Sequence, residues 1–130
     1  MTKWDEAKPV MNKKIAEYTK AVLQGKPNFH ISLVVDVSPE CDCDSCNDIP
    51  VIPDVGMFAS FDPVALDQAS VDAANAQPIT PGSIAAHNAE LGHDDHDVFH
   101  LVHPDTDWAA GLDHAEKLGI GTRKYELVKL

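Results

Sequence analysis

The sequence predicts an α/β fold with a small, partly parallel sheet flanked by helices. Residues 29–37 form an apolar, β-branched run, which is typical of a strand buried on both faces in an α/β sheet. Apolar residues at helical spacing precede this run at 10–23 and follow it at 62–76. Because 130 residues are enough for one modest hydrophobic core, we expect a single α/β domain over residues 1–130.

The first half of the chain is expected to contain a helix, two strands and the loop between them. Val10, Ile15 and Val22 recur at helical spacing, and Gly25 follows them as a residue that can end a helix. The elements expected here are a helix over 10–23, a strand over 29–37, a Cys/Asp-rich loop over 38–54 and a second strand over 55–60.

The second half begins with a well-marked helix. Asp62 can accept hydrogen bonds from the N–H groups of the first turn, and Pro63 suits the first helical position. Pro78 cannot continue the helix, which therefore ends near Ala76. The remaining expected elements are an irregular His/Asp-rich segment over 77–106 with a short helix near 83–91, a helix capped by Asp107 and ended by Gly119 or Gly121, and an edge strand over 124–130.

Three short strands make a small sheet, and the apolar run at 29–37 calls for a strand on either side of it. We therefore expect the sheet to be an incomplete part of a larger α/β domain. A homodimer or a docked upstream module would supply the remainder.

The charge of the chain excludes several classes of partner. With 21 acidic and 10 basic residues, the formal net charge is −11, and no cluster of Lys and Arg is present. Phosphate backbones and anionic membrane surfaces require such clusters, so neither nucleic acid nor a membrane is an expected partner. No apolar run reaches the roughly 20 residues of a membrane-spanning helix, and the start of the chain lacks a signal-peptide pattern. We expect a cytoplasmic protein.

The strongest local signal for chemistry is the Cys/Asp-rich loop. Cys41, Cys43 and Cys46 lie too close together for a disulfide framework, and thiolates bind zinc or iron well. We interpret Cys41, Cys43 and Asp48 as candidate metal ligands. A four-iron cluster normally takes four cysteines, so the chain has no complete site of that kind. The alternative is an acidic loop whose thiols have no function.

Two further carboxylates are candidate ligands or supporting groups. Asp36 follows the predicted strand, at the end where ligands bind in open α/β sheets, although it could equally cap the loop backbone. Asp67 shares a helical face with Val64 and Val71, and burying a carboxylate is costly unless it is paired. A structural hydrogen bond would also explain Asp67.

A tract of histidines offers a weaker metal site. His93, His96 and His100 lie beside Asp94 and Asp95, and His96 and His100 would share one face of a helix. Tracts of this composition also occur as solvated loops.

Several motifs, in a fixed order along nearly the whole chain, resemble one protein family. They are Trp4-Asp5-Glu6, Lys14-Ile15-Ala16-Glu17-Tyr18, Ser38-Pro39-Glu40-Cys41-Asp42-Cys43, Ile52-Pro53-Asp54-Val55-Gly56, the run 59–69 and the ending over 115–127. The chain resembles the C-terminal part of the uncharacterised Fe–S centre proteins, domain of unknown function family 362.

This resemblance implies a redox-linked protein. Family members place a ferredoxin-like module with two four-iron clusters upstream of the segment that begins at Trp4, and that module is absent here. The positions that match the family pattern, and so become site candidates by resemblance, are Cys41, Cys43, Asp48, Asp62 and Asp67. We expect a C-terminal domain with a metal or substrate site in the Cys/Asp loop. The alternative is a standalone metal-binding or assembly module without catalysis, and a hydrolase using Asp67 and a histidine ranks last.

Overall fold

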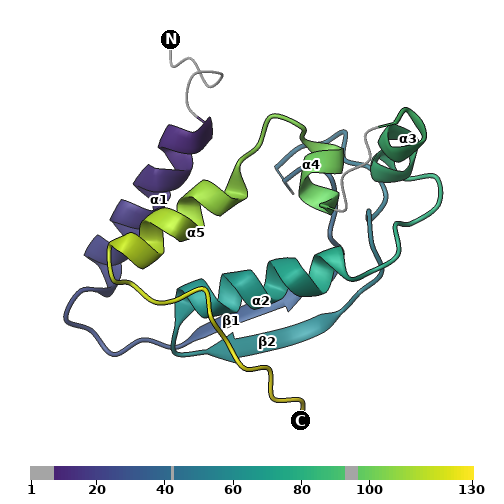
Figure 1. Ribbon diagram of the computed structural model, residues 1–130. Coiled ribbons are helices and arrows are strands. Elements are labelled where there is room, and N and C mark those ends of the chain that lie inside the picture. The colour runs from purple at the N-terminus through teal and green to yellow at the C-terminus, as the bar shows by residue number, and fades with distance from the viewer. Residues whose placement is uncertain (1–7, 42, 93–96) are drawn as a thin grey trace. The chain divides into compact units, whose positions relative to one another are not determined.

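The computed structural model describes residues 8–41, 43–92 and 97–130 (Figure 1). Helices and strands are mixed along the chain, which confirms the α/β class. Four helices lie where the sequence predicts them, and both strands of the sheet fall within predicted ranges. In chain order the elements are α1 (Lys8–Leu23), β1 (His30–Val34), β2 (Gly56–Ser60), α2 (Pro63–Asn75), α3 (Ile84–Glu90), α4 (Val98–Val102) and α5 (Trp108–Lys117).

The sheet consists of β1 and β2, which run antiparallel, so the partly parallel sheet predicted from the sequence is wrong (Figure 1). The N–H of Val55 donates to the carbonyl of Val34 at 2.8 Å, which places the end of β1 beside the beginning of β2. A parallel pair would require a crossover, usually a helix, between its strands. The segment between β1 and β2 contains no helix in its described residues and turns back on itself instead.

Strand β1 is buried on one face rather than on both. Val34 is buried and His30 and Ser32 are partly buried, whereas Ile31 and Leu33 are exposed. The hydroxyls of Ser32 and Ser70 lie 2.9 Å apart and join β1 to α2. The apolar run therefore predicted the strand correctly. The prediction that both faces of the strand are buried is wrong, because within the described residues a helix covers only one face.

The predicted strand over 124–130 is also wrong. The chain after α5 is instead attached by polar contacts of Thr122 and Arg123. Arg123 Nε donates to Gln68 Oε1 at 2.7 Å, its guanidinium pairs with Asp113, and it lies 5.8 Å from the centroid of the Trp108 ring. Alternating apolar residues form a strand only beside a partner edge, and residues 124–130 are neither helix nor strand.

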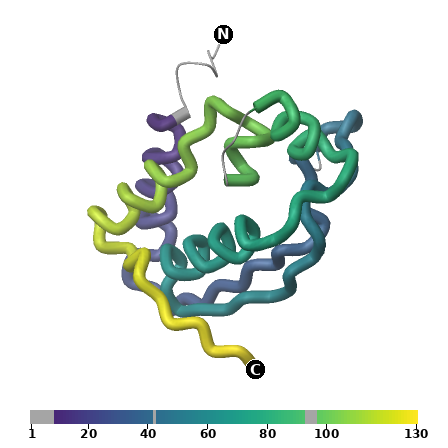
Figure 2. Tube along the Cα trace, turned by 45° about the vertical axis from the view of Figure 1, so that its right-hand side comes forward, coloured from purple at the N-terminus to yellow at the C-terminus, as the bar shows by residue number. Residues whose placement is uncertain are grey.

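The contacts divide the chain into two compact units. The first contains residues 1–32, 58–70 and 105–130. Its centre is the packing of α1 against α5, which lie side by side in Figures 1 and 2. Ala16, Val64 and Ala115 are buried there, and the apolar residues packed around them are Leu112, Leu118 and Ile120. Asn12 Nδ2 also donates to the carbonyl of Asp107 at 2.6 Å, so the start of α5 is tied to α1.

The second unit contains residues 33–57 and 71–104. Val51 and Ile52 are among its most buried side chains, and the N–H of Thr80 donates to the carbonyl of Val51 at 2.9 Å. Helices α3 and α4 pack together, and Asn88 Nδ2 donates to the carbonyl of Leu101 at 2.7 Å. Helix α4 was not predicted, because it is very short and lies within the segment that the sequence predicts to be irregular.

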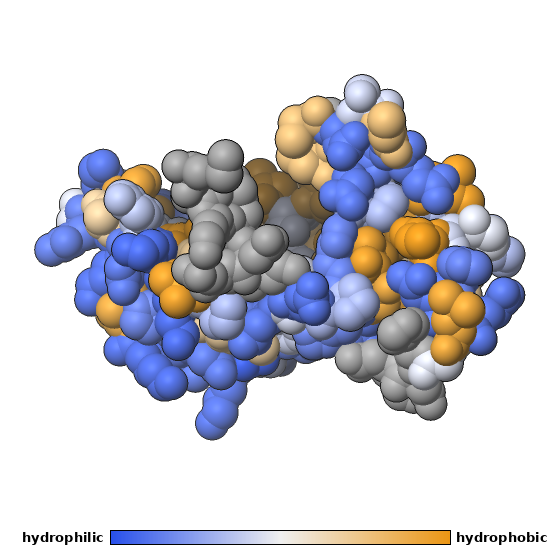
Figure 3. All heavy atoms as spheres, turned by 90° about the horizontal axis from the view of Figure 1, so that it is seen from above, coloured by the Kyte–Doolittle hydropathy of each residue, from blue (hydrophilic) through white to orange (hydrophobic). Residues whose placement is uncertain are grey.

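No helix within the described residues is long and apolar enough to cross a membrane. Hydrophilic residues dominate the face of the molecule drawn in Figure 3, where apolar side chains form separate groups. Both observations agree with the acidic composition of the chain.

Candidate functional site

The Cys/Asp loop, predicted as a metal site, has a hydrogen-bonded base. The N–H of Val51 donates to the carbonyl of Val37 at 2.8 Å and closes the loop behind β1. Within the loop, Asn47 Nδ2 donates to Ser38 Oγ at 3.0 Å and to the carbonyl of Glu40 at 2.9 Å. The N–H of Glu40 donates back to Asn47 Oδ1 at 3.1 Å. These bonds shape the base of the loop without using a thiol.

The three cysteines lie at the exposed end of this loop, and no two of them form a disulfide. A turn brings the N–H of Asp44 within 2.8 Å of the carbonyl of Cys41, and the N–H of Cys46 donates to Asp44 Oδ1 at 2.8 Å. Asp42 lies outside the described residues. In residues 8–41, 43–92 and 97–130, no three side chains of Cys, His, Asp or Glu converge as a metal site would require.

Asp48, predicted as a metal ligand, and Asp36, predicted as a further ligand or supporting group, make different contacts with the loop backbone. Asp48 is exposed, and its Oδ1 accepts the N–H of Ile49 at 2.8 Å. Asp36 has a left-handed backbone with φ of 48°, and its N–H donates to Asp54 Oδ1 at 2.9 Å. The loop after β1 is thus capped through a carboxylate, but the carboxylate belongs to Asp54 rather than to Asp36.

His103 reaches the base of the loop, a contact that the sequence analysis did not predict. Its Nε2 lies 2.7 Å from the carbonyl oxygen of Pro39 and 3.9 Å from Glu40 Oε1. Because a carbonyl can only accept, Nε2 carries a proton and donates it to this hydrogen bond. Metal-bound histidines commonly donate their other N–H to a backbone carbonyl in this way. The two residues are 64 positions apart, so no sequence spacing could have indicated the pair.

Asp62, a candidate by resemblance, makes contacts that hold the chain together. Its Oδ1 accepts the N–H groups of Val64 and Ala65 at 2.9 and 3.0 Å, which is the helix cap predicted from the sequence. Its Oδ2 accepts the N–H of Thr122 at 2.9 Å. One carboxylate therefore caps α2 and attaches the segment that follows α5.

Asp67 is an exposed residue on α2, yet its surroundings alter its titration. Desolvation by neighbouring groups raises the pKa of the Asp67 carboxyl, and the nearby His30 opposes that rise by lowering the pKa. The ring of His30 is hydrogen-bonded elsewhere, with Nε2 2.8 Å from Asn28 Oδ1. The pair is therefore an electrostatic contact beside β1, and it has no described hydrogen-bond chain to a nucleophile.

The histidine tract is only partly described. His93 and His96 lie outside the described residues. His100 belongs to α4, where its Nδ1 lies 3.3 Å from Asp97 Oδ2. Asp97 also accepts the N–H of Phe99 at 2.9 Å as the cap of α4, so the contact with His100 lies at the first turn of a short helix.

The sequence pattern of one family, the domain of unknown function DUF362, matches residues 2–72. The match covers more than half of the 130 residues. The chain belongs to this family. No curated protein and no solved structure matches the chain.

The DUF362 match includes the Cys/Asp loop and its neighbours in the chain. Cys41, Cys43 and Asp48 lie inside it, together with Asp62 and Asp67 on or beside α2. His103 lies outside it, although its ring contacts the loop.

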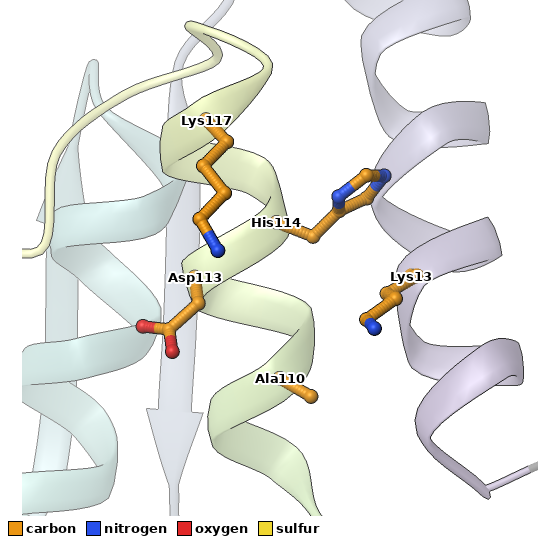
Figure 4. Close-up of a pocket in the computed structure, with 5 residues that line it drawn as sticks. All are labelled: Lys13, Ala110, Asp113, His114 and Lys117. Atoms are coloured by element: carbon orange, nitrogen blue, oxygen red, sulfur yellow. The ribbon is translucent and has the colours of Figure 1, made fainter.

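Helix α1, inside the DUF362 match, and α5, outside it, form the walls of a pocket of about 300 Å³ (Figure 4). His114 extends from α5 toward α1, and its Nε2 lies 3.2 Å from Glu17 Oε1. Lys13 projects from α1 into the same space, whereas Asp113 points to the other side of α5. The pocket is lined by Lys13, Ala110, Asp113, His114 and Lys117. Lys13, Asp113 and Lys117 are exposed, so the polar groups of the pocket lie at the surface.

Proposed function

We propose that the chain provides a thiolate metal site in a redox-linked protein of the DUF362 family. Cys41 and Cys43 would be ligands of zinc or iron, and Asp48 is a further candidate ligand. The observation that supports this proposal best is the exposure of three cysteines in one short loop whose base is held by hydrogen bonds of Asn47. Thiolates are strong ligands for both metals.

His103 adds a donor of suitable chemistry to this set. Its Nε2–H donates to the carbonyl of Pro39, two residues before Cys41, which places the imidazole ring beside the loop. The described side chains do not converge around one point, so we infer that metal binding closes the loop around the ion. Binding of this kind is coupled to deprotonation of the ligands and depends on pH.

The metal would act as a Lewis acid or as an electron carrier, according to its identity. Three cysteines are too few for a complete four-iron cluster, so four-iron clusters would lie on a ferredoxin-like module, as the family resemblance suggests. Such a module would be a docking partner of this chain. Asp36, at the same end of β1, would bind or orient a substrate beside the loop.

The test is elemental analysis of protein purified without oxygen. We expect near-stoichiometric zinc or iron in the wild type and its loss in Cys41→Ser/Cys43→Ser. Cys46→Ser is the matched control, because Cys46 is in the same loop but is not one of the proposed ligands. Absence of bound metal from the wild type, or equal loss in Cys46→Ser, would contradict the assignment of ligands.

The alternative function is a metal-binding or assembly module without catalysis, in which the metal maintains the fold. The base of the loop argues against it, because Ser38, Glu40 and Asn47 already join it by hydrogen bonds among themselves. A structural metal contributes to the free energy of folding. Cys43→Ser should therefore lose metal with little change in the melting temperature, whereas a large drop in that temperature would favour the alternative.

A further inference from the structure

The β1–β2 sheet has its apolar face toward solvent. Side chains alternate along β1, so that His30, Ser32 and Val34 lie on the face that α2 covers while Ile31 and Leu33 lie on the other. The hydroxyl of Ser60 likewise bonds within the chain, to the N–H of Asp62 at 2.9 Å. The covered face thus includes polar side chains, which is the reverse of the usual pattern for a sheet with one solvated face.

The uncovered side, which we call the outer face, consists of large apolar residues. Their exposed fractions are Phe29 54%, Ile31 60%, Leu33 65%, Met57 68% and Phe61 77%. Ala59, between Met57 and Phe61, is exposed as well. No charged residue occupies these alternating positions, although charged residues make up 24% of the chain.

Two aromatic rings make part of the outer face rigid. Phe29 and Phe61 are in edge-to-face contact, with ring centroids 5.0 Å apart and planes inclined at 63°. Rings already held in this way lose little conformational freedom when a partner covers them. Aromatic side chains of this kind often dominate the energy of protein interfaces.

The exposed apolar area is large enough for an interface. Five large side chains that are each more than half exposed present on the order of 500 Å² together. Two such faces would bury on the order of 1,000 Å², which is near the lower limit for a specific interface before any surrounding residues are counted. Scattered single exposed apolar residues need no explanation, but a set of this size on one sheet face does.

We propose that a second copy of this chain covers the outer face, so that the two sheets pack face to face. A two-fold interface requires a surface that is complementary to itself, and an uncharged apolar face fulfils this condition. Each copy has a formal net charge of −11, so contact through most other surfaces would bring like charges together. The outer face avoids that repulsion. Sheets packed in this way lie about 10 Å apart, with each α2 on the outside of the pair.

The experiment measures molar mass by light scattering over a range of protein concentrations. We expect the wild type to approach twice the 14.1 kDa chain mass. Ile31→Thr/Leu33→Thr places β-branched residues, which suit a strand, at both positions but makes the face polar, and it should raise the dimer dissociation constant at least about tenfold. Circular dichroism and thermal unfolding would establish that this variant is folded.

The matched control is Leu127→Thr/Val128→Thr, because these two residues are also highly exposed and lie outside the sheet. The control should dimerise like the wild type. A wild type that stays monomeric at all concentrations would overturn the proposal, and the outer face would then belong to a different partner. A dimer that survives the change at Ile31 and Leu33 but is lost in the control would also overturn it.

Discussion

A methyl group at Gly121 should disrupt the hydrogen bonds through which Asp62 connects α2 to the segment after α5. A Cβ at this position would lie 1.9 Å from Asp62 Oδ1, 2.5 Å from its Cγ and 2.8 Å from its Oδ2. Atoms do not approach so closely, so Gly121→Ala must displace the carboxylate. That carboxylate caps α2 through Val64 and Ala65 and accepts the N–H of Thr122.

The expected cost follows from the contacts that would be lost. Loss of a helix N-cap typically costs about 1 kcal/mol. Loss of the hydrogen bond from Thr122 adds about 1 kcal/mol, since a typical intramolecular hydrogen bond has that value. The free energy of unfolding should thus fall by about 1–3 kcal/mol, and the melting temperature by roughly 5–10 °C. If Asp62 could rotate away without losing its partners, the effect would be much smaller.

Denaturant unfolding of four proteins tests this reasoning: the wild type, Gly121→Ala, Asp62→Ala and the double variant. Once Asp62 is truncated, the methyl group has nothing to displace, so the second change should cost little in that background. Gly111→Ala is the control, because its Cβ would lie 3.4 Å from Asn12 Cβ and alanine favours a helix. It should preserve or raise stability. Equal effects of Gly121→Ala with and without Asp62 would refute the steric explanation.

Two carboxylates should make stability depend on pH in opposite directions. Desolvation raises the folded-state pKa of Asp67. The ionised carboxylate therefore lowers the stability of the folded state, and this loss grows as pH rises from the ordinary pKa through the raised value. Asp67→Asn should therefore be more stable than the wild type at pH 7, by less than about 1 kcal/mol for so exposed a group, and a less stable variant would contradict this. The pKa of Glu116 is lowered, mainly by the backbone N–H of Arg123 and then by the Thr122 hydroxyl. The ionised Glu116 therefore stabilises the folded state above its ordinary pKa, and this stabilisation is lost as pH falls through the lowered value. The protection factor of the Arg123 amide, which corrects the exchange rate for the intrinsic effect of pH, should fall over that acidic range in the wild type, and Glu116→Gln should remove this pH dependence.

Local signals predicted the helices well. Asp62 and Pro63 mark the start of α2, and Asp107 caps α5 by accepting the N–H of Ala110 at 3.0 Å. Capping depends on a side chain and on backbone groups two or three residues away, so the sequence contains the necessary information. The Ser83 cap of α3, which accepts from Ala86 at 3.3 Å, is an equally local contact.

The strand errors have one cause. The apolar run at 29–37 correctly predicted β1, but burial of its two faces depends on which elements lie against them. Residues 124–130 have the alternation of a strand, yet a strand exists only when another edge receives its hydrogen bonds. Neither condition can be found within a short window of sequence.

By itself, the sequence determined the family, the positions of four helices and two strands, and the cluster of thiols in one loop, because these depend on neighbouring residues. Only the tertiary structure decided that the strands are antiparallel, that His103 contacts the loop at Pro39, and that Asp62 reaches Thr122. The last two contacts join residues 64 and 60 positions apart. Contacts at such separations arise from the packing of whole elements, and many chain paths are compatible with the same local preferences.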